Sequence, residues 1–437
     1  MAPLSILIVG CGCAGPVLAS FLLLAPDTRP EDLPHITIVE RAGAHRAAGQ
    51  NIDIRGTGAT LIRKLGVEQK IRAATTGEEG MQIVDDQNQV WVSAPADKTG
   101  RVQTATSDIE ILRGTLVDIL TKRSEQISDG VKARGGRGID YVNGDYVEEL
   151  DQDGAKVHVR FAKSGERRSY DVVVGADGLQ SRTRRQAFGD EGDAQRLKYL
   201  STIAAFYSMP AAATDSLWRR WWHGENRRSI TVRPSGQEGR STVVLLLVHP
   251  DERATAVAKL GPKGAPQQKA LLKKYFDHGE WECDRVMREM EAADDFYYDL
   301  VAQVKMEKWH KGRVVLLGDA GCCAAPISGM GTTLALNGAY NLAGALTHHP
   351  DDPNAAFDAF ETAMRPLVDV AQKLPPGNPE LFHWKTSWGI WIMRWAFRAI
   401  FSSGIGTLAE KFMGPPADVV GVKEYGFRQP EEMQVDV

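Results

Sequence analysis

Cysteine is scarce in this sequence, and neither sign of charge dominates it. The five cysteines among 437 residues show no spacing typical of metal ligands, so we expect no metal site. Cys322 and Cys323 are adjacent and too close for an ordinary disulfide, which predicts reduced structural thiols in a reducing compartment. A net charge of −4 gives no electrostatic reason to expect nucleic-acid binding.

The N-terminal region also lacks the apolar run of a signal peptide. Its first apolar residues, 5–9, are better explained as a strand that leads into a glycine loop. We therefore expect a cytoplasmic protein that acts on a small molecule, as a monomer or weak dimer. A chain of 437 residues can bury a large core, which predicts two or three domains.

A strand–glycine–helix pattern opens the chain. The apolar residues 5–9 lead into Gly10, Gly12 and Gly15, and an apolar helix is predicted over residues 16–24. Gly10 suits a tight turn, Gly12 lets the backbone approach a pyrophosphate, and Gly15 lets helix and strand pack closely.

An acidic residue follows the second predicted strand, residues 36–39. Glu40 stands about twenty-five residues after the glycine loop, where a carboxylate accepts hydrogen bonds from a ribose 2′-hydroxyl. Arg41 follows directly, and we include it in the expected site. The combined pattern predicts the adenosine half of an FAD or NAD site.

A second glycine-rich segment lies near residue 320. A strand over residues 314–317 delivers Asp319 to a turn, and a helix is predicted to begin near Thr332, next to Gly331. Asp319 can accept hydrogen bonds from a chain of hydroxyls. The helix start offers free N–H groups and partial positive charge to the electron-rich edge of a reduced flavin.

Three further segments carry a charged residue from an extended stretch to the start of a helix. They are residues 49–55 before a helix over 57–65, residues 110–113 before a helix over 114–123, and residues 171–177 before an arginine-rich helix that Ser181 can cap.

Taken in this order, the motifs resemble the FAD-dependent aromatic-hydroxylase-type monooxygenases, which have the para-hydroxybenzoate hydroxylase fold. The resemblance covers residues 4–375 and is greatest for the branch of tetracycline-inactivating monooxygenases and related secondary-metabolism hydroxylases and epoxidases. It implies an α/β fold: a Rossmann-like FAD-binding domain of the glutathione-reductase type, an inserted α+β substrate domain with a mostly antiparallel sheet, and a C-terminal helix.

The resemblance also implies roles on the adenosine side of the cofactor. Gly10, Gly12 and Gly15 match the pyrophosphate loop and Glu40 the ribose ligand. Arg113 matches an arginine that contacts the ribityl–pyrophosphate region.

On the flavin side, Asp319 matches the aspartate on the ribityl chain, Pro326 the proline beside the flavin ring, and Asp53 an aspartate at the flavin end. Arg46 matches an arginine assigned to NADPH, and Asp177 lies in a turn that serves both FAD and nicotinamide.

Two features depart from the family pattern. Many relatives carry a histidine shortly after the second aspartate, whereas this chain reads Gly321, Cys322 and Cys323 there, so no role can be transferred from that histidine. Thr332 replaces a frequent asparagine, but threonine can still cap a helix. The arginines at 182–185 form either a solvated helix face or a site for a nicotinamide phosphate.

The expected domains follow from these assignments. Residues 1–190 form the first part of the FAD-binding domain, with a minor contribution to the substrate domain near 76–100. Residues 191–295 form the substrate domain, with strands over 201–209, 228–233 and 241–248, and helices follow over 267–276 and 281–291. Residues 296–375 complete the FAD-binding domain, and residues 376–437 form a bridging helix and tail.

The family chemistry implies a reaction. NADPH or NADH reduces FAD, O₂ adds at flavin C4a, and the hydroperoxide gives one oxygen atom to a hydrophobic, aromatic or polycyclic molecule, which is hydroxylated or epoxidised. An alternative is an FAD-dependent oxidase, reductase or oxidative cyclase on the same scaffold. A third is a flavin-binding protein without turnover.

Because the cofactor carries this chemistry, we expect no nucleophile–base pair. Side chains of the substrate domain are then candidates for substrate contact, with His223 as a general base and Arg219 as a second catalytic candidate. The candidates are Phe206, Arg219, Trp221, His223 and Arg233.

The segment after residue 380 repeats tryptophan at helical spacing, at positions 384, 388, 391 and 395, which predicts one strongly apolar face. We expect this helix to pack across the two domains, where it can also line the substrate site. The alternative is a helix on a membrane surface, since tryptophan beside lysine and arginine suits that environment.

Overall fold

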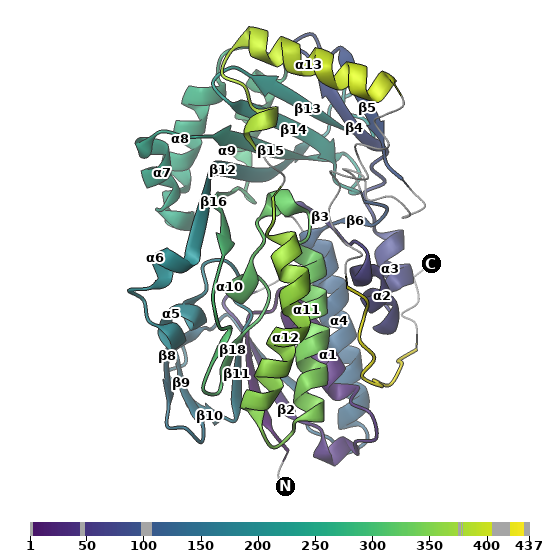
Figure 1. Ribbon diagram of the computed structural model, residues 1–437, viewed down its shortest axis with the longest axis vertical. Helices are drawn as coiled ribbons and strands as arrows, with labels where there is room; N and C mark the ends of the chain where they lie inside the picture. Colours follow the sequence, from purple (N-terminus) through teal and green to yellow (C-terminus); the bar gives the residue numbers. More distant parts are fainter. Residues whose placement is uncertain are drawn as a thin grey trace.

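The computed structural model describes residues 3–43, 49–97, 107–374, 377, 379–403 and 420–431. Figure 1 shows a parallel sheet with long helices at one end of the molecule and a large second sheet at the other. The expected α/β fold with an inserted, mostly antiparallel sheet is confirmed.

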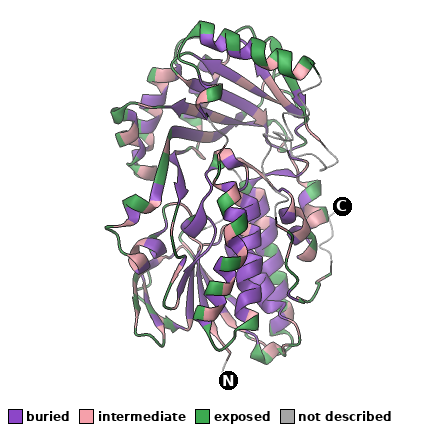
Figure 2. Cartoon of the chain, in the orientation of Figure 1, coloured by how far each residue is buried: buried purple, intermediate pink, exposed green. Residues whose placement is uncertain are grey.

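The first sheet has six strands in the order β17-β18-β11-β1-β2-β7, all parallel except β17. Its strands are β1 (Ser5–Val9), β2 (His35–Glu40), β7 (Ile139–Asn143), β11 (Val172–Gly175), β17 (His310–Lys311) and β18 (Val314–Leu316). Four long helices pack beside it: α1 (Ala14–Leu23), α4 (Arg113–Lys132), α11 (Gly331–His348) and α12 (Pro353–Ala371). Figure 2 shows that α11 is almost wholly buried among them.

The other face of this sheet packs on a three-stranded sheet of β8 (Val147–Gln152), β9 (Val157–Phe161) and β10 (Arg167–Tyr170). β9 and β10 form a hairpin that turns near residue 165. Residues 172–175 pair with β1 instead, because this apolar run is buried on both sides as a central parallel strand.

The large sheet has seven strands in the order β16-β12-β15-β14-β13-β4-β5. They are β4 (Gly80–Val84), β5 (Val90–Pro95), β12 (Leu197–Pro210), β13 (Trp218–Gly224), β14 (Arg228–Pro234), β15 (Arg240–Val248) and β16 (Tyr297–Val304). One expected boundary needs correction: β16 carries this sheet past residue 295, because its backbone pairs with β12. β13, over the arginine-rich residues 218–224, was not among the expected strands.

The two faces of the large sheet have different neighbours, since side chains alternate along each strand. One face, which includes Trp222 and Ile230, packs on α7 (Glu252–Ala258), α8 (Ala265–Phe276) and α9 (Cys283–Ala292). The other face includes Ala204 and Val301, and it contacts the loop before α11. This second face is therefore directed at the expected flavin site.

The C-terminal helix α13 (Ser387–Ser402) contacts β5 and β13, and Figure 1 shows it across the far end of the large sheet. The expectation that this helix bridges the two domains is therefore wrong. Residues 420–431 instead return to the end of the molecule with the parallel sheet, where Tyr425 and Phe427 pack on Tyr340 of α11 and Phe427 also packs on Phe21 of α1. Among the described residues, no helix has both the length and the apolar character needed to cross a membrane.

Candidate active site

The loop between β1 and α1 brings three backbone segments together. Gly10 has a φ of +113°, and a Cβ there would lie 2.5 Å from the carbonyl oxygen of Ala176. A Cβ on Gly15 would lie 2.3 Å from the carbonyl oxygen of Gly10. At Gly12 the nearest atom would be Arg113 Nη2, at 4.0 Å. Gly10 and Gly15 are thus fixed by packing inside the protein, whereas Gly12 borders open space that a ligand can use.

Glu40 closes this loop from the end of β2. Its carboxylate accepts hydrogen bonds from the N–H groups of Cys11, at 2.9 Å, and Ala42, at 2.8 Å. Arg41 is exposed beside it, and Arg46 lies outside the described residues. The carboxylate is therefore held at the mouth of the glycine loop, as a ribose ligand must be.

Asp177 uses its carboxylate within its own turn. It accepts hydrogen bonds from the N–H groups of Arg182, at 2.8 Å, and Thr183, at 3.0 Å, at the start of α5 (Arg182–Phe188). Ser181 accepts from the Arg184 N–H at 2.9 Å, so the expected cap is confirmed. The backbone of this turn, rather than the Asp177 carboxylate, lies against Gly10.

Arg184 corrects the interpretation of the arginine run as a solvated face. Its side chain is fully buried and pairs with Asp193 at 2.6 Å. It also donates to the carbonyl oxygens of Ala320, at 2.9 Å, and Leu179, at 3.0 Å. Arg184 therefore ties α5 to the loop that carries Asp319.

Asp319 is the first residue of the short helix α10 (Asp319–Cys322), after Gly318 with a φ of +62°. Asp319 is exposed to solvent, although protein atoms surround much of its carboxyl. Burial raises the pKa of its carboxyl, and the Arg113 guanidinium at the start of α4 opposes that rise. Arg113 and Asp319 are some two hundred residues apart in the sequence, yet they face the same space. A ribityl–pyrophosphate site requires this arrangement.

Both adjacent cysteines of this loop are buried. Burial raises the pKa of Cys322 to about 12 and that of Cys323 well above its ordinary value. These thiols stay protonated near neutral pH, which fits structural rather than redox-active cysteines.

The loop after α10 reaches the large sheet. Ala325 has a φ of +72°, which is strained for alanine, and it packs with Ala204 and Val301. Pro326 stands next to it with an exposed ring, and Gly331 opens α11 with free space around it. The loop therefore presents Pro326 and a helix start at the junction of the two sheets.

Asp53 ends β3 (Asn51–Asp53), which pairs with β6 (Glu110–Leu112). Its Oδ2 accepts from Arg55 Nη2 at 2.9 Å. Its Oδ1 is buried, and no described residue donates a hydrogen bond to it. A buried acceptor without a donor is what an N–H or O–H group of a bound ligand would satisfy.

Two acidic residues that sequence reasoning missed join the sheets near Asp53. Arg233 of β14 donates from Nε to Glu78 at 2.9 Å and binds Glu110 of β6 through Nη2. Burial raises the pKa of Glu110 to about 7 against the opposing charge of Arg233. Arg219 lies beside them, with Nε 3.8 Å from Glu78 Oε1. The sequence did contain one sign of this cluster: Glu110 interrupts the apolar residues 109–112, where a buried carboxylate needs a partner.

His223 lies further along β13 than Arg219, under α13. Its ring is buried, 4.4 Å from the Trp221 ring, and neither of its nitrogens has a hydrogen-bond partner among the described residues. Burial lowers its pKa well below the ordinary value. A neutral, weakly basic imidazole suits substrate contact better than the general-base role expected from the sequence.

The same strand face carries other buried polar atoms without hydrogen-bond partners in the described part of the chain, namely Arg219 Nε and Trp221 Nε1. Phe382 stacks on Trp221 at 5.5 Å. Of the other substrate candidates, Phe206 packs beside Ala204, whereas Arg233 is committed to the ion cluster.

These residues fit FAD. The glycine loop leaves room at Gly12, Glu40 and Asp319 offer carboxylates to hydroxyl groups, Arg113 faces the same space, and Asp53 has an unfilled acceptor.

Comparisons with known proteins agree with this geometry. The family described as FAD binding domain matches residues 4–370. FAD-dependent monooxygenase asL6 of Sarocladium schorii is 36% identical over 392 residues, which cover 88% of this chain and 90% of that protein. Monooxygenase CTB7 of Cercospora beticola is 32% identical over 430 residues, 97% of each chain. The solved tetracycline destructase Tet(51) has a TM-score of 0.71 and 27% identity, and the match covers 97% of this chain and all of that one.

The matched family spans most of the chain. The two monooxygenases named above, both more than 30% identical, match this chain over nearly their whole length. This chain therefore belongs to the FAD binding domain family and is an FAD-dependent monooxygenase of the aromatic-hydroxylase type.

Proposed function

We propose that this monooxygenase consumes NADPH or NADH and inserts one oxygen atom from O₂ into a hydrophobic, ring-containing small molecule, by hydroxylation or epoxidation. The observation that carries the proposal is the contact between the Ala325–Ile327 loop and the large sheet. This contact sets Pro326, where the flavin edge is expected, beside apolar residues of the large sheet that include Ala204 and Phe206.

When bound, FAD supplies the redox chemistry: a reduced nicotinamide gives it two electrons, and O₂ then yields one oxygen atom to the substrate and one to water. The protein's own residues hold and orient the partners. Glu40, Arg113 and Asp319 hold the cofactor, and Asp53 offers its free Oδ1 to a donor at the flavin end.

The strand face that carries Arg219 and Trp221 supports a flat aromatic substrate with a polar oxygen. Trp221 and Phe382 provide a stacked apolar surface, and Phe206 extends the apolar side chains toward β16. Trp221 Nε1 and Arg219 Nε are donors without hydrogen-bond partners in the described residues, so a carbonyl or phenolic oxygen would satisfy them.

The test compares the NADPH or NADH oxidised with the oxygen atoms found in the product and in hydrogen peroxide. The purified protein should bind FAD, oxidise NADPH or NADH in air, and, with an accepted substrate, transfer ¹⁸O from ¹⁸O₂ to the product. A panel of phenols, naphthols and anthracenones supplies the substrates. Hydrogen peroxide as the only reduced oxygen species with every substrate, or oxidised product without ¹⁸O, would favour the oxidase, reductase or cyclase alternative.

A further inference from the structure

The outer side of α13 exposes a row of tryptophans. Trp388, Trp391 and Trp395 are 67%, 55% and 47% exposed, and Trp384, just before the helix, is 40% exposed. The opposite side packs on the large sheet through residues such as Ile390 and Met393. Figure 2 shows the outer side of the helix as exposed. Large contiguous apolar patches of this kind mark interaction surfaces.

This helix region is positively charged within a chain of negative net charge. Residues 380–403 contain three basic residues against Glu380 alone, a net charge of +2, whereas the whole chain carries −4. Of the three, Arg394 is directed inward to the main-chain oxygen of His223, and Glu225 binds the N–H of Ser387 at the start of the helix, so Lys385 and Arg398 carry the outward charge. Arg398 lies over the rings of Trp91 and Trp395, at 5.9 and 5.7 Å. The charge therefore stands among the tryptophans and complements an anionic surface, whereas the same face of a second copy would repel it.

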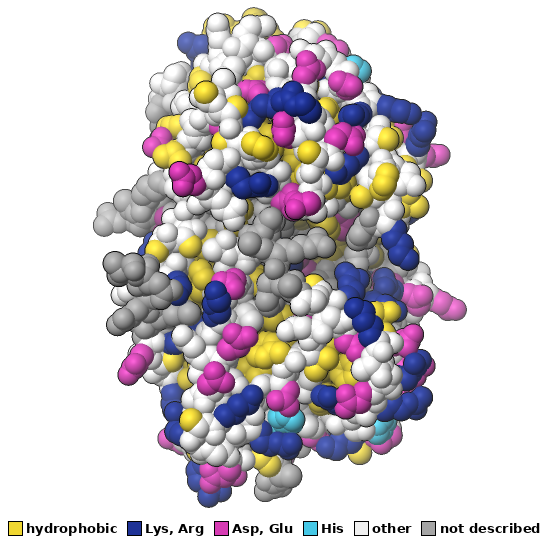
Figure 3. Space-filling model, turned by 180° about the vertical axis from the view of Figure 1, so that it is seen from behind, with side chains coloured by type: hydrophobic (Ala, Val, Ile, Leu, Met, Phe, Trp, Pro, Cys, Tyr) yellow, Lys and Arg dark blue, Asp and Glu magenta, His cyan; other side chains and the backbone are white. Residues whose placement is uncertain are grey.

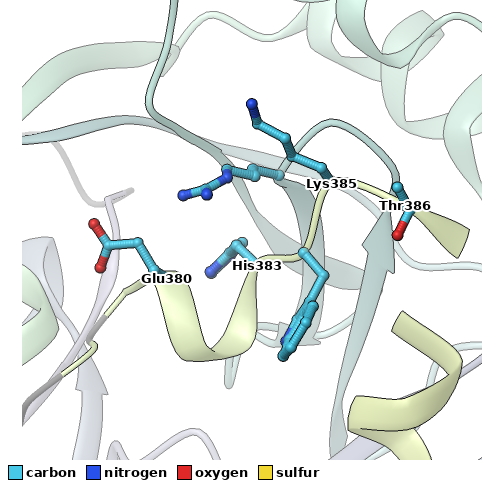
Figure 4. A pocket seen from close by; sticks show the side chains of 6 residues that line it. Glu380, His383, Lys385 and Thr386 are labelled. Atoms are coloured by element: carbon cyan, nitrogen blue, oxygen red, sulfur yellow. The ribbon is translucent and has the colours of Figure 1, made fainter. Parts of the chain in front are cut away.

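A small pocket of about 320 Å³ opens beside the start of this aromatic row (Figure 4). Arg227, from the turn between β13 and β14, lines it together with Glu380, His383, Trp384, Lys385 and Thr386. The Glu380 carboxylate contacts His249 Nε2 at 2.7 Å. Within the described residues, Arg227 Nε and Nη1 are buried without hydrogen-bond partners. The pocket thus brings the side chains of Arg227 and Lys385 together, and two neighbouring cations suit a phosphate group.

We propose that α13, together with Trp384 and the Arg227–Lys385 pocket, docks this protein on the surface of an anionic phospholipid bilayer. The helix lies in the plane of the membrane, the tryptophan rings reach the headgroup level, and Arg227, Lys385 and Arg398 bind lipid phosphates. The inference is independent of the proposed reaction, because it uses none of the residues that hold the cofactor.

Docking in this orientation also affects the substrate side of the molecule. Phe382 and Phe397, from the same region, stack on each other at 5.3 Å, and Phe382 stacks on Trp221 of the large sheet. A hydrophobic substrate dissolved in the bilayer would then lie close to the strand face that we propose to receive it.

Vesicle co-sedimentation of the full chain tests the proposal. Vesicles of phosphatidylcholine alone are compared with vesicles containing one third phosphatidylserine, at low and at high salt. We expect binding to the anionic vesicles that weakens as salt rises, because exposed charges are screened. The double variant W388S/W391S should weaken that binding at least about tenfold, since it removes the apolar contact. The double variant R227Q/K385Q should weaken it by about fivefold for each charge removed.

Leu260→Ser is the matched control, because Leu260 is 50% exposed but lies outside α13. It should bind vesicles like the unchanged protein, and circular dichroism should show every variant folded. Equal binding by W388S/W391S and the unchanged protein, or no binding to anionic vesicles, overturns the proposal. A dimer in lipid-free solution that W388S/W391S dissociates would also overturn it, by assigning the tryptophan row to a second copy.

Discussion

The Arg184 guanidinium donates from Nη1 to the main-chain carbonyl oxygen of Ala320, at a distance of 2.9 Å. Ala320 directly follows Asp319, so this bond joins the turn of Asp177 to the loop that carries the expected ribityl ligand. Arg184 also forms a buried ion pair with Asp193. One side chain therefore sets the distance between two motifs that bracket the cofactor.

Replacing Arg184 with glutamine should weaken FAD binding at least about tenfold, because the Asp319 loop loses its anchor. It should also lower the free energy of unfolding by about 3–5 kcal/mol, since Asp193 is left buried without its partner. Fluorescence titration with FAD and denaturant unfolding measure the two effects. Arg185→Gln is the control, because Arg185 on the same helix faces the exposed Asp190 and should change neither quantity by more than about 0.5 kcal/mol. An unchanged FAD affinity in the Arg184 variant would exclude the anchoring role.

The glycine loop allows packing to be separated from ligand binding. Gly12→Ala adds a Cβ whose nearest protein atom is Arg113 Nη2 at 4.0 Å, an ordinary contact, so the apoprotein should unfold like the original while FAD binding falls. Gly15→Ala adds a Cβ 2.3 Å from a main-chain oxygen, so it should lose both stability and FAD binding. Thermal unfolding of FAD-free protein and FAD titration distinguish these outcomes. If Gly12→Ala binds FAD normally, the pyrophosphate does not pass over this residue.

Trp221→Phe keeps an aromatic ring on the strand face but removes the Nε1 donor. If that donor binds a substrate oxygen, KM should rise about fivefold to tenfold, the loss of one hydrogen bond, with FAD binding unchanged. Steady-state kinetics with any substrate found in the ¹⁸O screen measure this change. Trp309→Phe is a suitable comparison, since Trp309 is buried against α12 and should leave KM unaltered. An unchanged KM in Trp221→Phe would remove this residue from the substrate site.

Two buried histidines predict how stability depends on pH. Burial lowers the pKa of His383 to about 4 and that of His223 well below its ordinary value. Below about pH 6.5 these two histidines bind protons in the unfolded chain but not in the folded chain. Their contribution to the free energy of unfolding is therefore fully present above about pH 6.5 and is lost as the pH falls. For His383 the loss approaches about 3 kcal/mol near pH 4.

Denaturant unfolding at several pH values measures this slope. His383→Gln should flatten it between about pH 6.5 and 4, whereas the exposed His278→Gln should leave it unchanged. The same slope in both variants would mean that His383 is not buried as a neutral ring.

Much of the cofactor side could be predicted from the sequence because its elements are local. A strand, a tight glycine turn and a helix are encoded within about twenty residues, and the acid at the end of β2 follows at a regular spacing. Gly318 and Asp319 likewise follow a buried strand directly. The order of such motifs was enough to indicate the fold and the class of cofactor.

The ion cluster at the junction of the sheets could not be predicted in this way. Glu78, Glu110 and Arg233 are far apart in the chain and lack a shared spacing. They meet only because the fold brings the end of β14 beside β6, and burial then requires each charge to find a partner. The burial of Arg184 has the same origin, since only the folded chain places Asp193 and Ala320 around one guanidinium.

The sequence by itself determined that α13 is a helix with aromatic residues at regular spacing. It did not determine which side of that helix faces the protein, because Ile390 and Met393 form a second apolar stripe opposite the tryptophans. The tertiary structure decided this: the smaller stripe fits against β5 and β13, and the bulky rings remain in solvent. Periodicity fixes the faces of a helix, whereas only the shape of its neighbours selects the face that is buried.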